Sequence, residues 1–171
     1  APRPGCAMVV SMSALGEDAA RRLLNRAAYG PRPNEVASTA RMTRADWIEA
    51  QLALPAENRE VSLALAALVM PIRYVAGPGE QMADEQRVLA SLTMTQAQRW
   101  ALTDNRAPIA WPERDRPRLE LSAATLLRKV LAPDQLRERL VEFWHDHFSV
   151  AAQSGLPVAV YYGQARERKF T

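Results

Sequence analysis

Residues 135–150 read QLRERLVEFWHDHFSV, and this stretch holds both histidines of the chain and its clearest helical pattern. Because a helix turns by about 100° per residue, spacings of three and four residues bring side chains onto one side. One side of this predicted helix carries Leu136, Leu140, Phe143 and His147, with Val141, Trp144 and Phe148 beside them. An apolar stripe of this kind normally faces the core. We therefore expect His147 to be buried within an aromatic surround, which consists of Phe143, Trp144 and Phe148.

The opposite side of the same predicted helix is polar. It carries Glu138, Glu142 and His145, which we expect to form an exposed acid–base cluster. A step of two residues sends side chains to different sides of a helix, so the two histidines point apart. The sequence thus distinguishes an exposed His145 from a buried His147 whose ring nitrogens need hydrogen-bond partners.

The rest of the chain also favours helices. Alanine, leucine and arginine dominate, alternating strand-like patterns are nearly absent, and proline and glycine stand at the ends of helix-length blocks. Further helices are predicted over residues 15–28, 33–41, 44–54, 82–103 and 118–131, and an interruption of the fourth at residues 93–95 is left open. A buried segment is predicted at 61–75, broken by Pro71, and a loop at 105–117. We therefore predict an all-α fold, an irregular multi-helix bundle of about six to eight helices with Pro/Gly-rich connections.

Local signals mark two helix starts and one further core face. Thr43 followed by Asp46 has the form of a capping box, which opens the helix carrying Trp47. Pro133 and Asp134 favour the start of the last helix. In the helix predicted at 118–131, the core-facing stripe consists of Leu119, Ala123, Leu126, Leu127 and Val130.

Length and composition indicate one ordinary domain. The chain has 171 residues, of which 48% are hydrophobic and 24% charged, and it is long enough to bury a core. We place the helical domain at residues 14–150. Residues 1–13 are expected to form a flexible tail or a cloning remnant, and residues 151–171 an irregular C-terminal segment with a truncated end.

The charge balance and the cysteine count exclude several classes of protein. A net charge of +3 arises from 22 basic and 19 acidic residues, so no nucleic acid partner is expected. Cys6, the single cysteine, excludes an internal disulfide and a cysteine-based zinc site, and its own role stays open. No signal peptide and no transmembrane segment are visible in this chain. We interpret the densest basic group as a solvated turn. This group consists of Arg114, Arg116, Arg118 and Arg128.

Glu142 and His145 have the Glu-x-x-His spacing of helical metal sites, in which both side chains reach the same ion. Such a site needs a second copy of the motif and two further carboxylates, but the chain has only two histidines. We therefore favour the acid–base cluster, with a metal ion or haem as an alternative that needs ligands from outside this chain. For His147, a hydrogen-bonded core histidine is favoured over a ligand or a general base. No catalytic residue is identified, and whether the protein is an enzyme stays open.

Three stretches resemble a bacterial family. Residues 20–33, ARRLLNRAAYGPRP, are similar to the N-terminal signature of the DUF1800 family, and residues 47–52, WIEAQL, to the tryptophan helix that follows it. Residues 135–148 resemble the most recognisable motif of the family, which usually has asparagine where this chain has Asp146. The stretch after Gly155 departs from the expected pattern.

This resemblance implies the N-terminal portion of a longer, predominantly helical bacterial protein of unknown biochemical activity. Members of the family often carry export signals, so a periplasmic or secreted location is implied. The implied partners are the later helices of the full-length protein or another protein. The leading interpretation is a buried structural or binding centre at residues 144–148. The alternatives are part of a metal- or haem-dependent enzyme and a protein interaction module. The last of these predicts an exposed apolar patch where missing helices pack.

Overall fold

The computed structural model describes residues 13–55, 58–75 and 82–148. Its elements are α1 (Glu17–Ala27), α2 (Glu35–Thr39), α3 (Arg44–Ala53), α4 (Arg59–Ala67), β1 (Val69–Tyr74), β2 (Ala83–Val88), the short 3-10 helix η1 (Ala90–Leu92), α5 (Gln96–Ala101), α6 (Trp111–Leu131) and α7 (Gln135–His147). The fold is broadly helical as predicted, but the described residues also form a two-stranded sheet, so the all-α prediction is incomplete. Cys6, nearly all of the predicted tail and the predicted C-terminal segment lie outside the described residues.

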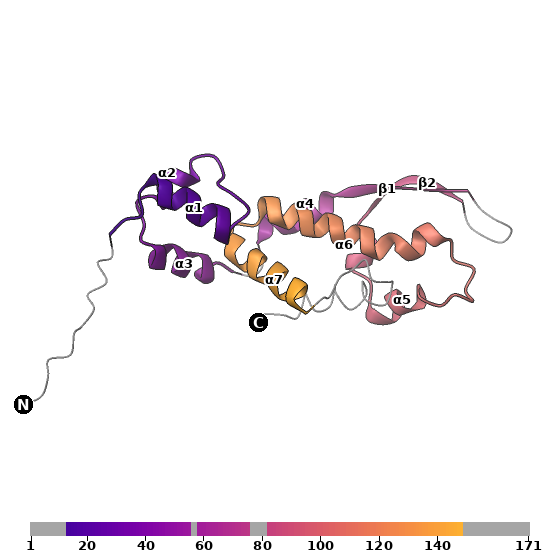
Figure 1. Ribbon diagram of the computed structural model, residues 1–171. Helices are drawn as coiled ribbons and strands as arrows, with labels where there is room; N and C mark the ends of the chain where they lie inside the picture. Colours follow the sequence, from indigo (N-terminus) through magenta and orange to yellow (C-terminus); the bar gives the residue numbers. More distant parts are fainter. Residues whose placement is uncertain (1–12, 56–57, 76–81, 149–171) are drawn as a thin grey trace, which may run out of the picture.

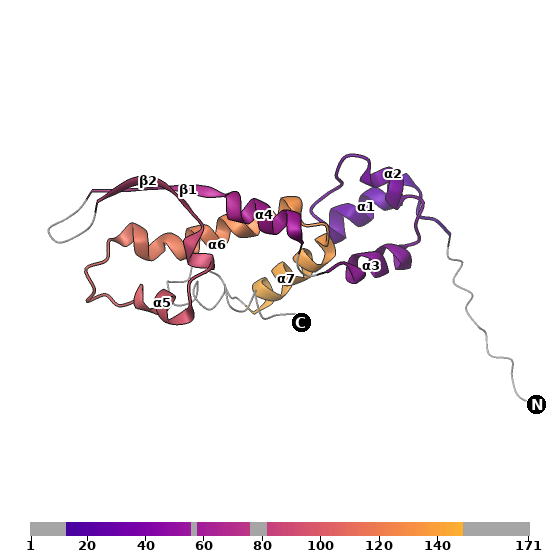
Figure 2. The same cartoon turned by 180° about the vertical axis from the view of Figure 1, so that it is seen from behind.

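The molecule is elongated, with α7 between two groups of elements. Figure 1 shows α1, α2 and α3 at one end. The second group consists of α4, the β1–β2 hairpin, α5 and α6, and the view from behind in Figure 2 shows the same arrangement. Because α7 contacts α1, α3 and α6, it joins the two groups.

The first group is built around a small apolar core. Leu24 of α1 packs against Trp47 of α3, both almost fully buried, and Leu136 of α7 contacts the same core. The predicted capping box is present at the start of α3. The Thr43 hydroxyl accepts a hydrogen bond from the Asp46 N–H, and the Asp46 carboxylate accepts one from the Thr43 N–H.

The hairpin is the part of the fold where the helical prediction was wrong. Its antiparallel register runs from the pair Val69–Val88 to the pair Tyr74–Ala83. Pro71 has no amide hydrogen to donate, which disfavours a continuing helix but is tolerated in a two-stranded sheet, where each strand has an unpaired edge. Ile72 is buried, and β1 contacts α6. The helix predicted at 82–103 is replaced by β2, η1 and the short α5.

α6 begins inside the stretch that was predicted to be a loop. Pro112 lies in its first turn, where amide hydrogens have no partner within the helix, so its missing hydrogen costs no bond. Pro117 follows in the second turn. The connection before α6 is held by Arg114. Its guanidinium donates hydrogen bonds of 2.7–3.1 Å to the carbonyl oxygens of Leu102, Asp104, Ala107 and Ile109. Pro112 therefore marks the start of the helix, Pro117 lies inside it, and Arg114 stabilises the chain that leads into it.

α6 is 21 residues long and carries charged side chains along its length. Neither α6 nor any other helix of the described ranges is long and apolar enough to cross a membrane.

Candidate functional site

α7 turns most of its predicted apolar stripe outward, although Leu136 and Val141 of that stripe face the protein. Its buried side consists of Gln135, Glu138 and Val141. Its outer side exposes 54% of Phe143 and 66% of Phe148, and His147 is exposed beside them, whereas His145 is half-buried. The prediction of a buried aromatic and histidine centre is therefore wrong, and the acidic side that was expected to be exposed faces the protein.

The outer side of α7 forms a continuous aromatic surface, which we call the outer aromatic face. It consists of Leu140, Phe143, Trp144, His147 and Phe148. The rings of Phe143 and Trp144 meet edge to face with 5.3 Å between their centroids, and those of Trp144 and Phe148 stack at 5.6 Å. The His147 imidazole stacks on Phe143 at 5.8 Å. These rings pack along the surface of the helix and leave the imidazole exposed.

A polar cluster on the inner side of α7 explains this orientation, and we call it the inner polar clasp. It consists of Tyr29, Lys129, Gln135, Arg139 and Glu142. The Gln135 amide nitrogen donates hydrogen bonds to the carbonyl oxygens of Lys129 at 3.1 Å and Ala132 at 2.7 Å. Its amide oxygen accepts one from the backbone N–H of Tyr29 at 3.3 Å. One buried side chain thus joins the end of α1 to the end of α6.

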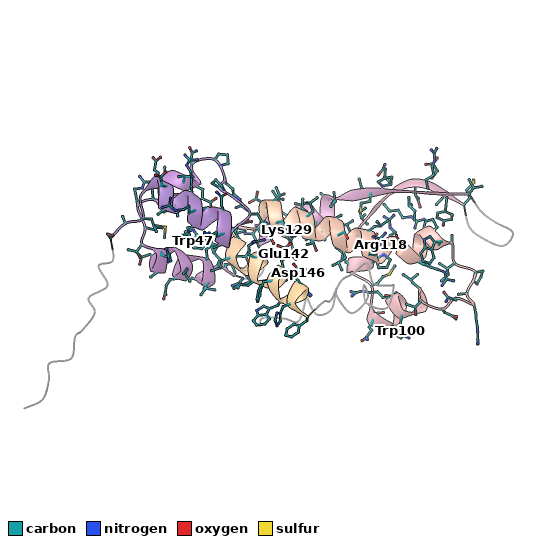
Figure 3. All side chains as sticks on the ribbon, viewed as in Figure 1. Trp47, Trp100, Arg118, Lys129, Glu142 and Asp146 are labelled. Carbon is teal, nitrogen blue, oxygen red and sulfur yellow. The ribbon has the colours of Figure 1, made fainter. Side chains whose placement is uncertain are left out.

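Glu142 lies at the centre of the clasp. Its carboxylate accepts hydrogen bonds of 3.0 Å from the Tyr29 hydroxyl and from the Arg139 guanidinium, and it is ion-paired with Lys129. Lys129 and Arg139 also lie over the Tyr29 ring, each 5.2 Å from its centroid. Figure 3 shows Lys129 and Glu142 meeting between α6 and α7. One phenol and two cations therefore engage a single carboxylate.

The electrostatics of the clasp favour an ionised Glu142 and a protonated Tyr29. Burial opposes ionisation of Glu142, but hydrogen bonds from Lys129 and Tyr29 and the positive charge of Lys129 outweigh it, so the pKa of Glu142 lies below its ordinary value. Burial, and then the hydrogen bond to Glu142 and its negative charge, raise the pKa of Tyr29. Tyr29 therefore remains a hydrogen-bond donor, and neither group exchanges a proton near neutral pH.

The same contacts involve the carboxylates for which the sequence offered a metal site as the alternative to an acid–base cluster. Glu142 is engaged by the clasp, and the Glu138 carboxylate lies 4.0 Å from the Arg128 guanidinium. Among the residues that the structure describes, no three His, Cys, Asp or Glu side chains are grouped as a metal ion requires. A ligand role for His145 or His147 stays a prediction that needs donors from elsewhere. Elemental analysis of full-length protein purified without a metal-affinity tag checks it.

A buried ion pair in α6 was missed in the sequence. Glu120 is fully buried, and its Oε2 accepts hydrogen bonds from the Ser91 N–H at 2.7 Å and the Ser91 hydroxyl at 2.6 Å. Its Oε1 lies 2.5 Å from Arg116 Nε, at an angle unsuited to a hydrogen bond, and Arg116 also donates to two carbonyl oxygens at the end of β2. The prediction of a solvated basic turn is wrong for Arg114 and Arg116, which are buried. The available signal was the four-residue spacing of Arg116 and Glu120.

α6 also turns much of its predicted core stripe outward. Leu126 exposes 64% of its surface, and Leu119 and Val130 are exposed as well. The buried positions of α6 are Arg114, Arg116, Pro117, Glu120, Leu121 and Ala124. Two successive helices therefore present large apolar side chains to solvent and bury charged or polar side chains beside apolar ones.

The three stretches that carry the family resemblance meet around the turn between α6 and α7. Arg32, in the first stretch, donates hydrogen bonds to two carbonyl oxygens at the end of α6, at 3.0 and 2.6 Å. Gln51, in the second, donates to the Pro133 carbonyl at 3.2 Å and accepts from the Leu136 N–H, at the start of the third stretch, at 3.1 Å. These bonds satisfy backbone groups that helix ends leave without a partner. Residues up to 100 apart in sequence are thus held together.

The amino-acid sequence matches one family model over nearly its whole length. The family is DUF1800, which is described as "Protein of unknown function", and the match covers residues 22–170. It includes the stretch after Gly155, so the expectation that this stretch departs from the family pattern is corrected. No curated protein and no solved structure matches the chain. The chain belongs to the DUF1800 family.

Proposed function

We propose that this chain is a protein interaction module whose binding surface is formed by the apolar side chains that α6 and α7 turn outward. The observation that carries the proposal is the outer aromatic face, in which Phe143 and Phe148 are more than half exposed. Exposed apolar patches rimmed by polar residues are typical of protein interfaces, and aromatic side chains often supply much of the binding energy there.

The inner polar clasp supports this function because it fixes which side of α7 is available. Turning the helix to bury Phe143 would separate Glu142 from Tyr29 and Lys129. A buried polar group that loses its partner costs about 1–3 kcal/mol, so several such losses together oppose the rotation. The outer aromatic face is therefore held in its exposed position by bonds on the other side of the same helix.

The chemistry of the surface fits an amphipathic α-helix as partner. α7 has 13 residues, which corresponds to a length of about 20 Å. A narrow apolar stripe of this length is matched by a second helix whose side chains pack between its own. We expect the partner to be a later helix of a full-length family member or a helix of another protein.

We also propose that the protein acts outside the cytoplasm, as an exported bacterial protein. Support comes from the resemblance of its signature stretches to a family in which export signals are common. Fractionation of bacteria that produce the full-length protein tests this location. Recovery with periplasmic or secreted markers is expected, and recovery with cytoplasmic markers alone would contradict it.

Binding of the fluorescent probe anilinonaphthalene sulfonate tests the surface, because this probe reports exposed apolar area. We expect the parent chain to bind the probe, and the double substitution Phe143→Ser/Phe148→Ser to remove most of the signal. The matched control is Leu63→Ser, which removes an exposed leucine from α4 and should leave the signal unchanged.

Far-UV circular dichroism must show that each variant keeps the helical content of the parent. If the folded double variant binds as much probe as the parent, the outer aromatic face is not the apolar surface, and the proposal fails.

A further inference from the structure

We infer that the outer aromatic face pairs two copies of this chain, with α7 of one copy antiparallel to α7 of the other. This rests on the proposed interaction surface and names its occupant, the same surface of a second copy. The spacing of the apolar residues and the order of charges along α7 carry the inference.

The apolar positions of the outer aromatic face repeat as they do in two-helix interfaces. Leu140, Phe143 and His147 follow one another at intervals of three and four residues, which places them along one seam. Phe143 is near the middle of this seam. A twofold axis passing there brings Leu140 of one copy against His147 of the other, and the same contact forms twice because a twofold interface is self-complementary.

The charges beside the seam favour the antiparallel arrangement. Arg139 and Asp146 are seven residues apart and lie on the same flank, one near each end of α7. Antiparallel pairing sets Arg139 of each copy against Asp146 of the other, whereas parallel pairing would set this flank against the opposite flank of the partner, where Trp144 lies, and would form no such ion pair.

Both charged side chains can reach a partner. Arg139 is partly exposed and has five N–H donors, of which its bond to Glu142 uses one. Asp146 is exposed and forms no ion pair within the described part of the chain. The charged flank of one copy therefore complements the same flank of a second copy.

The size of the face predicts a weak dimer. Four exposed apolar side chains per copy, Leu140, Phe143, Trp144 and Phe148, each offer on the order of 100 Å² for burial. Roughly 400 Å² per copy is about half of what stable complexes bury on each partner. We therefore expect association that depends on concentration, with a dissociation constant in about the micromolar range or above.

Sedimentation equilibrium of the full chain, with a reducing agent that prevents disulfides through Cys6, measures the association. We expect Asp146→Arg to weaken dimerisation by about tenfold or more, because each flank then carries only positive charge. Arg139→Asp should weaken dimerisation to the same extent, because each flank then carries only negative charge. An equimolar mixture of the two variants should restore association, because each mixed pair joins a positive flank to a negative one.

Two controls accompany this experiment. Leu63→Ser, on the exposed surface of α4, should leave the dissociation constant unchanged. Thermal unfolding of each variant shows that it is folded, since Arg139 also belongs to the inner polar clasp. A dimer that persists unchanged in both Asp146→Arg and Phe143→Ser would overturn the inference.

A chain that stays monomeric at every concentration would also overturn it. If that monomer still binds the apolar probe through the outer aromatic face, the proposed interaction module stands with a different occupant. If the monomer binds no probe at the outer aromatic face, both the proposed dimer and the proposed interaction module are contradicted.

Discussion

The two sides of α7 differ in what they contact. The inner side is joined to α1 and α6 by the hydrogen bonds and ion pairs of the clasp, while the outer side carries the larger apolar side chains. Burying one large apolar side chain contributes about 1.5–3 kcal/mol, and leaving one buried polar group unpaired costs about 1–3 kcal/mol. Because these magnitudes are similar, the polar partners that distant stretches supply can determine which side of a helix faces the protein.

The largest expected effect concerns Glu120, the fully buried carboxylate of α6. Glu120→Ala leaves the charge of Arg116 buried without its partner and the Ser91 N–H without an acceptor. We expect a loss of about 3–5 kcal/mol in the free energy of unfolding, measured by urea denaturation. The control Arg116→Met/Glu120→Leu removes both charges and leaves the Ser91 N–H without its acceptor, so it should lose only about 1–3 kcal/mol, less than Glu120→Ala. A loss below about 1 kcal/mol for Glu120→Ala would show that polar contacts do not hold α6 in its orientation.

The next largest effect concerns the inner side of α7. Gln135→Ala removes the partner of the Tyr29 N–H and of two carbonyl oxygens at the end of α6. We expect a loss of about 2–3 kcal/mol in urea denaturation, because backbone groups in a buried turn lose their hydrogen bonds. Gln86→Ala, on the exposed surface of the hairpin, should change stability by less than about 0.5 kcal/mol. Equal effects of the two substitutions would contradict the stabilising role of Gln135 in the inner polar clasp.

A smaller, pH-dependent effect is expected at Glu142. Its pKa in the folded protein is lowered, so its ionised form contributes stability above the ordinary glutamate pKa, and this contribution is lost as the pH falls through the folded value. Glu142→Gln should therefore be less stable than the parent at neutral pH, by about 1 kcal/mol because the carboxylate is partly exposed. Thermal unfolding should show the two proteins converging on acidification. A gap that does not change with pH would contradict an ionised Glu142.

The smallest effect is expected on the outer side. Phe143→Ser should change the stability of dilute, monomeric protein by less than about 0.5 kcal/mol, because the ring is more than half exposed. Truncation of a buried phenylalanine typically costs about 3–5 kcal/mol. Urea denaturation at low protein concentration distinguishes the two values, and a loss in the higher range would restore the buried orientation that the apolar stripe predicted.

Local signals in the sequence were sufficient to locate α1, α3 and α7. The capping box of Thr43 and Asp46, for example, depends only on residues that are near neighbours in the chain. The hairpin was missed because its strands are defined by pairing with each other, and Pro71 alone indicates only where a helix cannot continue. The start of α6 was missed because its prolines were interpreted as loop residues.

The candidate site was predictable only in part. The family resemblance marked the stretches that contain Tyr29, Gln51 and Gln135, and the structure brings these residues to one turn. One sequence could not show that Tyr29 contacts Glu142, since the two are 113 residues apart. Without that partner the acidic side of α7 looked exposed and His147 looked buried, and both expectations were wrong for the same reason.

The bonds that Tyr29 and Arg32 make to the α6–α7 turn also set an order of folding. During synthesis, Arg32 is added about 100 residues before Ala132, whose carbonyl oxygen it binds. Until Ala132 has been added, water is the partner of the Arg32 guanidinium. Contacts of such long separation form slowly, because a large loop must close before they are made. The contacts that the segment after α1 makes with the α6–α7 turn therefore form only after the last described helix has been synthesised.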